Sequence, residues 1–355
     1  MEFSPPVIIN NRKIGPDFPV YIIAELSANH NQNYEKAVAL VQAAKKAGAD
    51  AIKLQTYTAD TITINCDNEF FKIKGTIWEG KNLYELYQEA FTPWDWHPRL
   101  KKVANELGMD LFSTPFDFSA VEFLENMGVP AYKIASFENG DIPLIKKIAG
   151  TGRPIIMSTG MAGIGEIEEA VDTIYESGNR QLALLKCSSA YPAPAAEMNL
   201  RAIQLLRDIF QVPVGISDHT LGISVPIAAV ALGANIIEKH FTLDRKEPGP
   251  DSTFSLEPQE FKEMVAAVRI CEKALGKNKL GPGPEELKSR VFRRSLFVVK
   301  DMDKGEEFTV ENLRSIRPAN GLHTRYYEQI LGKKASNSIK MGTPLSWALV
   351  SGEGN

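Results

Sequence analysis

Cysteine is scarce in this 355-residue chain, which has three: Cys66, Cys187 and Cys271. They lie far apart and are odd in number, so a disulfide framework is excluded. Few, scattered thiols are typical of a reducing compartment. We therefore expect a cytoplasmic protein without structural disulfides.

Long apolar runs and a large excess of positive charge are also missing. No apolar stretch approaches the roughly 20 residues that a membrane span needs, and the first residues lack the apolar segment of a signal peptide. The net charge of −4 does not supply the basic surface of a nucleic-acid-binding protein. We expect neither a membrane nor a nucleic acid as partner. The 44% hydrophobic composition suffices for one large domain plus a small one.

A repeated alternation of short apolar runs and helical stretches fills most of the chain. Each run is apolar throughout, as in a parallel strand buried on both faces, and several helical stretches end at glycines such as Gly48, Gly128 and Gly233. The eight runs are Val20–Leu26, Ala51–Thr56, Leu111–Phe116, Ala131–Ser136, Pro154–Gly160, Leu182–Ser189, Pro213–His219 and Asn235–Phe241. Eight such units over about 250 residues predict a (β/α)8 TIM barrel. The rival is a doubly wound open sheet, but the glycine-rich phosphate loop usual in that fold does not follow the first run.

The composition changes after the last barrel helix, which we expect over Pro258–Leu275. Glycine, lysine and proline then follow one another as in a linker. From about Val291 short elements alternate with turns, and we expect a strand at Arg294–Val299 and a short helix after Thr309. The predicted domains are a catalytic barrel over residues 1–280, a linker over 281–290 and a small domain over 291–355.

One connection is unusually long for a barrel. Residues 57–94 separate the second strand from the next expected helix and include Trp78, Tyr87 and Trp94. A long loop in a compact domain is usually functional, and this one leaves the carboxyl end of a strand. It is expected either to overhang the active face or to form an aromatic cover packed on the barrel.

Two of the five histidines, His219 and His240, end neighbouring predicted strands. In TIM barrels the chemistry lies at the carboxyl ends of the strands, so the two rings can converge on one point. Imidazole is a ligand of transition metals, and a catalytic metal keeps positions open for water or substrate. The pair predicts a metal site, which a carboxylate such as Glu25 or Asp251 could complete directly or through water.

Lys53 and Lys133 lie inside apolar runs, where a lysine is costly unless an anion compensates its charge. Several hydroxyl side chains stand at the same strand ends. Two lysines among hydroxyls predict a site for phosphate and carboxylate groups. The alternative is that a glutamate such as Glu25 or Glu138 satisfies each lysine.

These residues belong to segments that resemble a known family. The segments are Ile23–Asn31, Lys53–Gln55, Tyr132–Ser136, Ser158–Gly160, Tyr191–Pro194, Gly215–Thr220, Glu238–His240, Pro248–Asp251 and, in the small domain, Ile316–Gly321. Together they resemble the sialic acid synthase family, whose members condense phosphoenolpyruvate with an amino sugar to give nonulosonic acids. The resemblance covers essentially the whole chain, and it identifies the small domain as similar to the antifreeze-like (SAF) domain.

The resemblance implies a divalent metal, manganese, magnesium or cobalt, on His219 and His240. It also implies a domain-swapped homodimer, in which the SAF domain of one subunit caps the active site of the other and Arg317 reaches the partner's sugar. Glu25 is expected to handle the proton of the attacking water. The implied substrate-binding residues are Lys53, Gln55, Thr114, Lys133, Ser136, Ser158, Ser189, Tyr191, Ser217, Asp251 and Arg317.

Within the family, Ala24–Gln32, Lys53–Ile62 and Leu83–Gln88 look most like the members that make pseudaminic acid from 2,4-diacetamido-2,4,6-trideoxy-L-altrose. Leu26-Ser27 and Ser189 depart from the residues usual in synthases of N-acetylneuraminic acid. The alternatives are a legionaminic or N-acetylneuraminic acid synthase, another barrel enzyme that uses phosphoenolpyruvate or a metal, and a non-catalytic sugar-binding protein.

Overall fold

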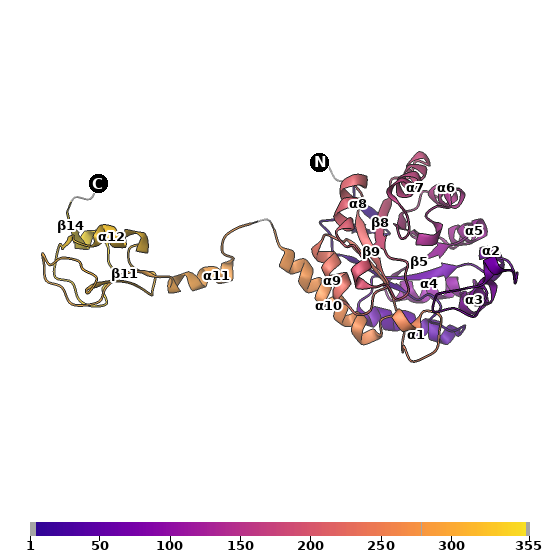
Figure 1. Cartoon of the computed structure of the whole chain (residues 1–355), viewed down its shortest axis with the longest axis horizontal. Coiled ribbons are helices and arrows are strands. Elements are labelled where there is room, and N and C mark those ends of the chain that lie inside the picture. Colours follow the sequence, from indigo (N-terminus) through magenta and orange to yellow (C-terminus); the bar gives the residue numbers. More distant parts are fainter. Residues whose placement is uncertain (1–4, 278, 353–355) are drawn as a thin grey trace. The chain divides into compact units, whose positions relative to one another are not determined.

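Eight parallel strands close into a barrel in the computed structural model of the chain, which describes residues 5–277 and 279–352 (Figure 1). The strands are β3 Tyr21–Glu25, β4 Ala51–Thr56, β5 Asp110–Pro115, β6 Tyr132–Ile134, β7 Ile155–Ser158, β8 Leu182–Cys187, β9 Val214–Asp218 and β10 Ile236–His240. The last strand pairs with the first, since β10 lies between β9 and β3. The predicted TIM barrel is therefore confirmed, and the open sheet is rejected.

Eight helices surround the strands. They are α1 Tyr34–Ala47, α4 Trp96–Glu106, α5 Phe118–Met127, α6 Ile142–Ala149, α7 Ile164–Glu176, α8 Ala202–Phe210, α9 Ser224–Ala231 and α10 Pro258–Leu275. Their ends follow the expected chemistry: the side chain of Asn33 accepts a hydrogen bond from Lys36 N at the start of α1, and Gly48, at φ 96°, ends that helix. None of the described helices is both long and apolar enough to cross a membrane.

A β-hairpin that the sequence patterns did not predict lies at the amino-terminal end of the barrel strands. It consists of β1 Val7–Ile9 and β2 Arg12–Ile14, and its inward side chains join the barrel core. Tyr21 Oη, at the start of β3, donates to Asp110 at the start of β5, and Asn10 of the hairpin contacts the same carboxylate. The hairpin therefore packs at the end of the barrel opposite the carboxyl ends of the strands.

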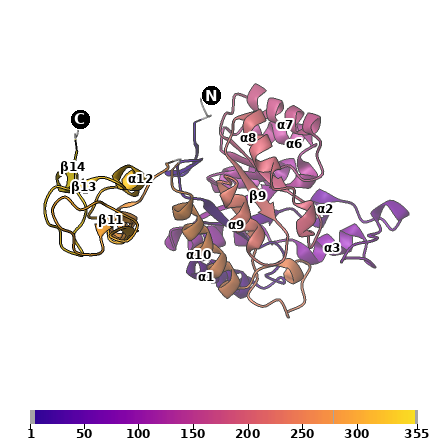
Figure 2. The ribbon, with the colours of Figure 1, turned by 60° about the vertical axis from the view of Figure 1, so that its left-hand side comes forward.

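The long connection between β4 and α4 folds into an insert, which we define as residues 57–94. It contains two helices, α2 Ala59–Ile62 and α3 Leu83–Ala90, and a short 3-10 turn at Glu69–Phe71. Figure 2 shows α2 and α3 at one side of the barrel, with the loop between them reaching outward. The insert leaves the carboxyl end of β4, so it lies on the face where the strand ends place their polar side chains.

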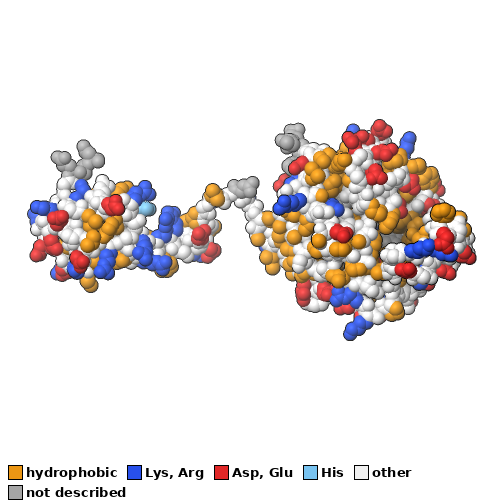
Figure 3. All heavy atoms as spheres, viewed as in Figure 1, with side chains coloured by type: hydrophobic (Ala, Val, Ile, Leu, Met, Phe, Trp, Pro, Cys, Tyr) orange, Lys and Arg blue, Asp and Glu red, His pale blue; other side chains and the backbone are white. Residues whose placement is uncertain are grey.

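The chain divides into two compact units, with the boundary between Gly276 and Lys277. The second unit contains α11 Pro284–Lys288, β11 Ser295–Val298, β12 Leu313–Ile316, α12 Tyr327–Ile330, β13 Lys334–Ala335 and β14 Val350–Ser351. Acidic and basic side chains are interspersed over the visible face of each unit in Figure 3.

The second unit has its own core, to which Leu296, Phe308 and Ile330 contribute. The predicted strand at Arg294–Val299 is confirmed as β11. The short helix expected after Thr309 is wrong: Leu313 N donates to Thr309 O at 3.0 Å, and this turn leads directly into β12. Helix α11 lies within the range expected as a linker.

Candidate active site at the barrel mouth

His219 and His240 converge at the carboxyl end of the barrel. His240 is the last residue of β10, and His219 follows β9 directly, so the pairing of these strands brings the two ring centroids to 5.3 Å. Both side chains are buried. Burial, reinforced by the neighbouring His219, lowers the pKa of His240 well below its usual value, so this imidazole is neutral.

The donor atoms of this pair fit a metal. The Nδ1 atom of His219 lies 2.9 Å from the carbonyl oxygen of Ser188, an arrangement that fixes the tautomer and leaves Nε2 with a free lone pair. The Nδ1 atom of His240 is buried and has no hydrogen-bond partner in the described part of the chain. No cluster of three or more His, Cys, Asp or Glu side chains suited to a metal occurs among the described residues. A metal held by these two histidines would leave positions open for water or substrate.

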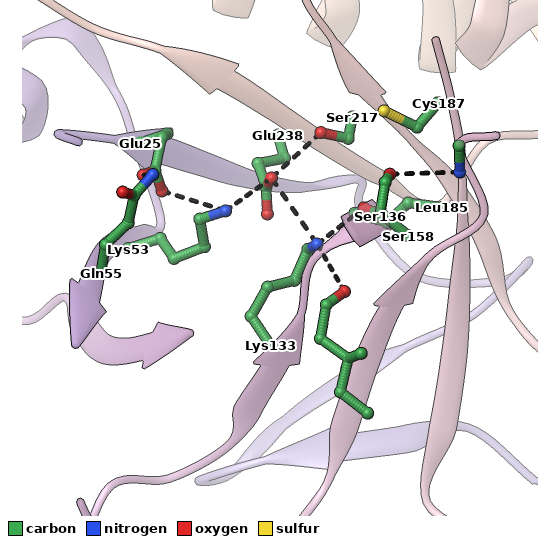
Figure 4. Close-up of polar contacts among 12 residues, drawn as sticks. Glu25, Lys53, Gln55, Lys133, Ser136, Ser158, Leu185, Cys187, Ser217 and Glu238 are labelled. Atoms are coloured by element: carbon green, nitrogen blue, oxygen red, sulfur yellow. Dashed lines mark hydrogen bonds and ion pairs between the residues drawn. The ribbon is translucent and has the colours of Figure 1, made fainter. Parts of the chain in front are cut away.

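Lys53 lies between two glutamates inside the barrel. Its Nζ is 2.8 Å from Glu238 Oε1 and 3.1 Å from Glu25 Oε2, and all three side chains are buried (Figure 4). Burial alone would lower the pKa of Lys53, but the two carboxylates more than offset this and raise it. Burial also raises the pKa of Glu25, against the opposing effect of Lys53. Lys53 therefore stays charged, whereas Glu25 is poised to exchange a proton.

Lys133 reaches toward Glu238 from another strand, β6, but its ion pair with Glu238 is longer than that of Lys53. Its Nζ donates to Ser158 Oγ at 2.6 Å and to Ile134 O at 2.9 Å, whereas Glu238 Oε1 is 3.9 Å away (Figure 4). The side chain is 1% exposed. Burial, only partly offset by Glu238, lowers the pKa of Lys133 to about 8. A buried cation held mainly by neutral oxygens is suited to receive an anion.

Of the predicted hydroxyl residues, Ser158 contacts this lysine directly, and Ser136 and Ser217 lie nearby (Figure 4). Ser217 Oγ donates to Glu238 Oε1 at 3.1 Å. The hydroxyl of Thr114 is buried and has no hydrogen-bond partner among the described residues, so it can donate to a ligand. The Ser136 hydroxyl accepts from Gly160 N at 3.1 Å.

Gly160 makes room for two of the predicted serines. A Cβ atom at this position would lie 2.6 Å from Ser136 Oγ and would overlap Ser189 Oγ. Both contacts are closer than side chains tolerate, so a side chain here would displace at least one of the hydroxyls. Glycine is required at residue 160 to let these two serines approach each other.

A second group of polar side chains lies beside the histidines. Gln55 Nε2 donates to Glu25 Oε1 at 3.1 Å and to Ser27 Oγ at 3.0 Å, and the Ser27 hydroxyl contacts Asp251. Ser27 has a positive φ of 45°, a conformation unfavourable for serine that is common at functional sites. The Tyr191 ring lies 4.4 Å from the His219 ring, centroid to centroid.

A cavity of about 340 Å³ opens between this group and the insert. Its polar lining from the barrel comprises Ser27, Gln55, Glu138, Tyr191, His240 and Asp251. Burial raises the pKa of Glu138 to about 7. The cavity therefore connects one of the paired histidines with the polar residues expected to face the sugar.

The structure brings the predicted residues of the first unit together at one barrel mouth. Arg317 lies in the second unit, where it is exposed and shares a pocket with Arg293 and Arg294. The prediction omitted Glu238, which contacts both lysines, as well as Ser27 and Gly160. Alternation along β10 was the signal for Glu238, since a residue two positions before His240 faces the same side of a strand.

The fold and the site define a class: a barrel whose mouth combines a histidine pair with buried lysines, joined to a small accessory domain. A family model described as the NeuB family matches residues 40–280, and one described as the SAF domain matches residues 293–351. The chain belongs to the NeuB family. The resemblance stated from the sequence motifs is thereby confirmed.

Similar proteins support this membership over nearly the full length. The chain is 50% identical to a pseudaminic acid synthase of Campylobacter jejuni, covering 93% of this chain and 96% of the relative. It is 47% identical to a pseudaminic acid synthase of Helicobacter pylori, covering 92% and 97%. Among solved structures, an N-acetylneuraminic acid synthetase of Leptospira borgpetersenii in complex with citrate matches with a TM-score of 0.72 at 35% identity, covering 81% of this chain and 96% of that chain.

Proposed function

We propose that the protein is a pseudaminic acid synthase. It condenses phosphoenolpyruvate with 2,4-diacetamido-2,4,6-trideoxy-L-altrose and water, and it releases pseudaminic acid and phosphate. The observation that carries this proposal is the identity of 50% to the Campylobacter jejuni relative over 93% of the chain. The two-part site supports it, because buried lysines suit a phosphate and a carboxylate, and a histidine pair suits a carbonyl-activating metal.

The phosphoenolpyruvate half of the site comprises the lysines and the hydroxyls around them. Lys133 and the unpartnered hydroxyl of Thr114 can donate hydrogen bonds to a bound anion. Lys53 forms ion pairs with the neighbouring glutamates. The complete set proposed for this half is Lys53, Thr114, Lys133, Ser136, Ser158, Ser189 and Ser217. These groups bind the phosphate and carboxylate and stabilise the charge that develops as phosphate leaves.

The sugar half comprises Gln55, Tyr191 and Asp251. A divalent metal held by His219 and His240 (manganese, magnesium or cobalt) would supply Lewis-acid chemistry toward the aldehyde oxygen of the open-chain sugar. Two observations support the fit of this histidine pair to a metal. The Nδ1 atom of the neutral His240 ring has no hydrogen-bond partner among the described residues, and the contact with Ser188 fixes the tautomer of His219.

The reaction joins C3 of phosphoenolpyruvate to the aldehyde carbon, while water adds to C2 and the bond between C2 and the phosphate oxygen then breaks. Glu25 accepts the proton that the attacking water loses, since its pKa is raised by burial and Gln55 orients its carboxylate. Near-normal turnover of Glu25→Gln would refute this role. Lys133 stays beside the departing phosphate throughout.

We further propose a domain-swapped homodimer in the cytoplasm. In this arrangement the SAF domain of one subunit, residues 291–355, caps the barrel of the other, residues 1–280. Residues 281–290 link the barrel and the SAF domain within each subunit. The exposed Arg317 then reaches the partner's sugar. Free thiols at Cys66, Cys187 and Cys271 support a reducing compartment.

The test is release of inorganic phosphate from phosphoenolpyruvate in the presence of diacetamido-trideoxyhexoses, with and without a chelator. We expect release with the altro-configured sugar, much less with the manno-configured sugar, and none after chelation. Equal activity on both sugars would remove the product assignment. Condensation without phosphate release would identify an aldolase instead.

A further inference from the structure

The insert supplies a wall of different chemistry to the cavity at the barrel mouth. The barrel contributes polar side chains, among them His240, together with Phe116, Ala135, Phe137 and Pro250, whereas the insert contributes mainly apolar side chains and Thr76. The apolar residues of the insert that line the cavity are Tyr57, Ile62, Ile73, Trp78, Leu83, Leu86, Tyr87 and Ala90. A single cavity therefore has a polar side at the metal-binding histidine and an apolar side at the insert.

The apolar wall is attached to the barrel at two places. The Trp78 indole donates from Nε1 to Pro250 O at 2.9 Å, and its ring lies 5.6 Å from that of Tyr191. At the other end of the insert, the Tyr57 ring makes edge contacts with the rings of Tyr87 at 5.5 Å and Phe116 at 5.1 Å. These contacts place the wall directly over the residues proposed to bind the sugar.

Part of this wall remains accessible from the cavity. Ile62, Ile73 and Leu83 are only half-buried, and they line the cavity. A ligand that places hydroxyl groups against such side chains loses their hydration without gaining hydrogen bonds, whereas a methyl group is favourably buried there. The wall is therefore suited to an apolar substituent.

The geometry of an open-chain sugar decides which substituent this is. Its aldehyde carbon is C1, which the proposed reaction places at the histidine pair. C6 is the carbon farthest from C1, so a sugar that extends across the cavity from His240 directs C6 toward the insert. We propose that the insert is the specificity-determining segment, and that Ile62, Ile73 and Leu83 select a C6 methyl group over a C6 hydroxymethyl group. This inference rests on the proposed function and assigns the recognition of C6 to particular residues of the insert.

The experiment compares two sugars that differ in one oxygen atom: 2,4-diacetamido-2,4,6-trideoxy-L-altrose and its 6-hydroxy analogue. Phosphate release gives kcat/KM for each sugar at saturating phosphoenolpyruvate. The wild-type protein is expected to prefer the 6-deoxy sugar by roughly 100-fold, the discrimination that an apolar pocket achieves against an added hydroxyl. The variants Ile62→Thr and Ile73→Thr place a hydroxyl on the wall, and each is expected to reduce the preference by about tenfold, mainly by lowering kcat/KM for the 6-deoxy sugar.

The matched control is Ile64→Thr, which makes the same substitution in the same insert. Ile64 is 59% exposed and does not line the cavity, so its variant should keep the wild-type preference. Thermal unfolding of all three variants checks that the insert substitutions leave the fold intact, and having two wall variants keeps the test valid if one of them is unstable.

The outcomes separate this inference from the proposed function. If wild type releases phosphate with both sugars at equal kcat/KM, or if both wall variants keep the wild-type preference, the inference is overturned and the synthase assignment stands. If wild type releases no phosphate with either sugar, the proposed function fails, and the inference fails with it. A reduced preference in the wall variants alone supports both.

Discussion

The proposed role of Lys133 in binding phosphoenolpyruvate predicts how kcat/KM for this substrate should change with pH. Burial lowers the pKa of its ammonium group to about 8 in the free protein, so the group is charged below that pH and neutral above it. An anion bound beside Nζ favours the charged form. We therefore expect kcat/KM for phosphoenolpyruvate to fall as the pH rises through about 8, because this parameter reports the pKa values of the free enzyme. A separate decline is expected on the acid side, where Glu25, whose pKa is raised by burial, becomes protonated and can no longer accept a proton.

The size of the effect follows from the distance at which Lys133 acts. An anionic oxygen about 4 Å from Nζ interacts with it by about 4 kcal/mol at an effective dielectric constant of about 20. This corresponds to roughly a thousandfold in kcat/KM. The variant Lys133→Met should therefore lose roughly a thousandfold at neutral pH, and its pH profile should lack the decline near pH 8. It should still fold, since burial already disfavours the charge that the substitution removes.

The assay is phosphate release at saturating sugar across a pH series, with thermal unfolding of each variant at the same pH values. Lys133→Arg retains a charge that does not titrate, so its profile should also lack the decline. Lys147→Met is the control, because Lys147 pairs with Glu122 on the outer helices, and it should behave as wild type. A decline near pH 8 that persists in Lys133→Met would show that another group titrates there.

Three further predictions concern positioning and assembly. Gly160→Ala should lower kcat/KM for phosphoenolpyruvate at least about tenfold, because its methyl group would displace the two serine hydroxyls that face it; thermal unfolding should show a loss of about 1–3 kcal/mol, and unchanged kinetics would contradict the contact. Lys239→Met should destabilise the barrel by about 3–5 kcal/mol in urea unfolding, because it leaves the buried Asp218 without its partner at 2.6 Å; adding Asp218→Leu should recover part of the loss, and a purely additive double variant would argue against the pair. Arg317→Ala and Glu25→Gln should each be inactive alone. A re-equilibrated mixture of the two variants should regain about a quarter of wild-type activity if each site combines the barrel of one subunit with Arg317 of the other. A mixture without activity would refute the domain-swapped arrangement.

Most of the barrel could be predicted from the sequence, because its strands are buried on both faces. Continuous apolar runs located β4 at Ala51–Thr56 to the residue and the other strands to within a few residues. Glycines marked helix ends at Gly48 and Gly128, where the backbone has a positive φ. The histidine pair could be predicted for the same reason: parallel strand order fixes which carboxyl ends are neighbours.

Other features depend on contacts between distant segments, which local patterns do not contain. The hairpin of β1 and β2 has strands of only three residues, too short for a periodic signal. In place of the helix expected after Thr309, a turn leads into β12. The pairing of β12 with β11 outweighs the local capping signal. The aromatic residues of the insert were visible in the sequence, but the cavity that they line requires Pro250 and Tyr191 from the far side of the barrel mouth.

The partner of Lys53 shows why the two halves of the site cannot vary independently. The sequence offered Glu25 or Glu138 as counter-ions, and the structure adds Glu238, which contacts Lys53 directly and lies 3.9 Å from Lys133. Glu238 stands two residues before His240 on β10, so the same short strand positions the charge network around the two lysines and the imidazole proposed to bind a metal. Any shift of β10 that alters one half also moves the other. In the proposed reaction, the distance between phosphoenolpyruvate and the sugar aldehyde is therefore set by a buried strand, while the choice of sugar is left to the insert.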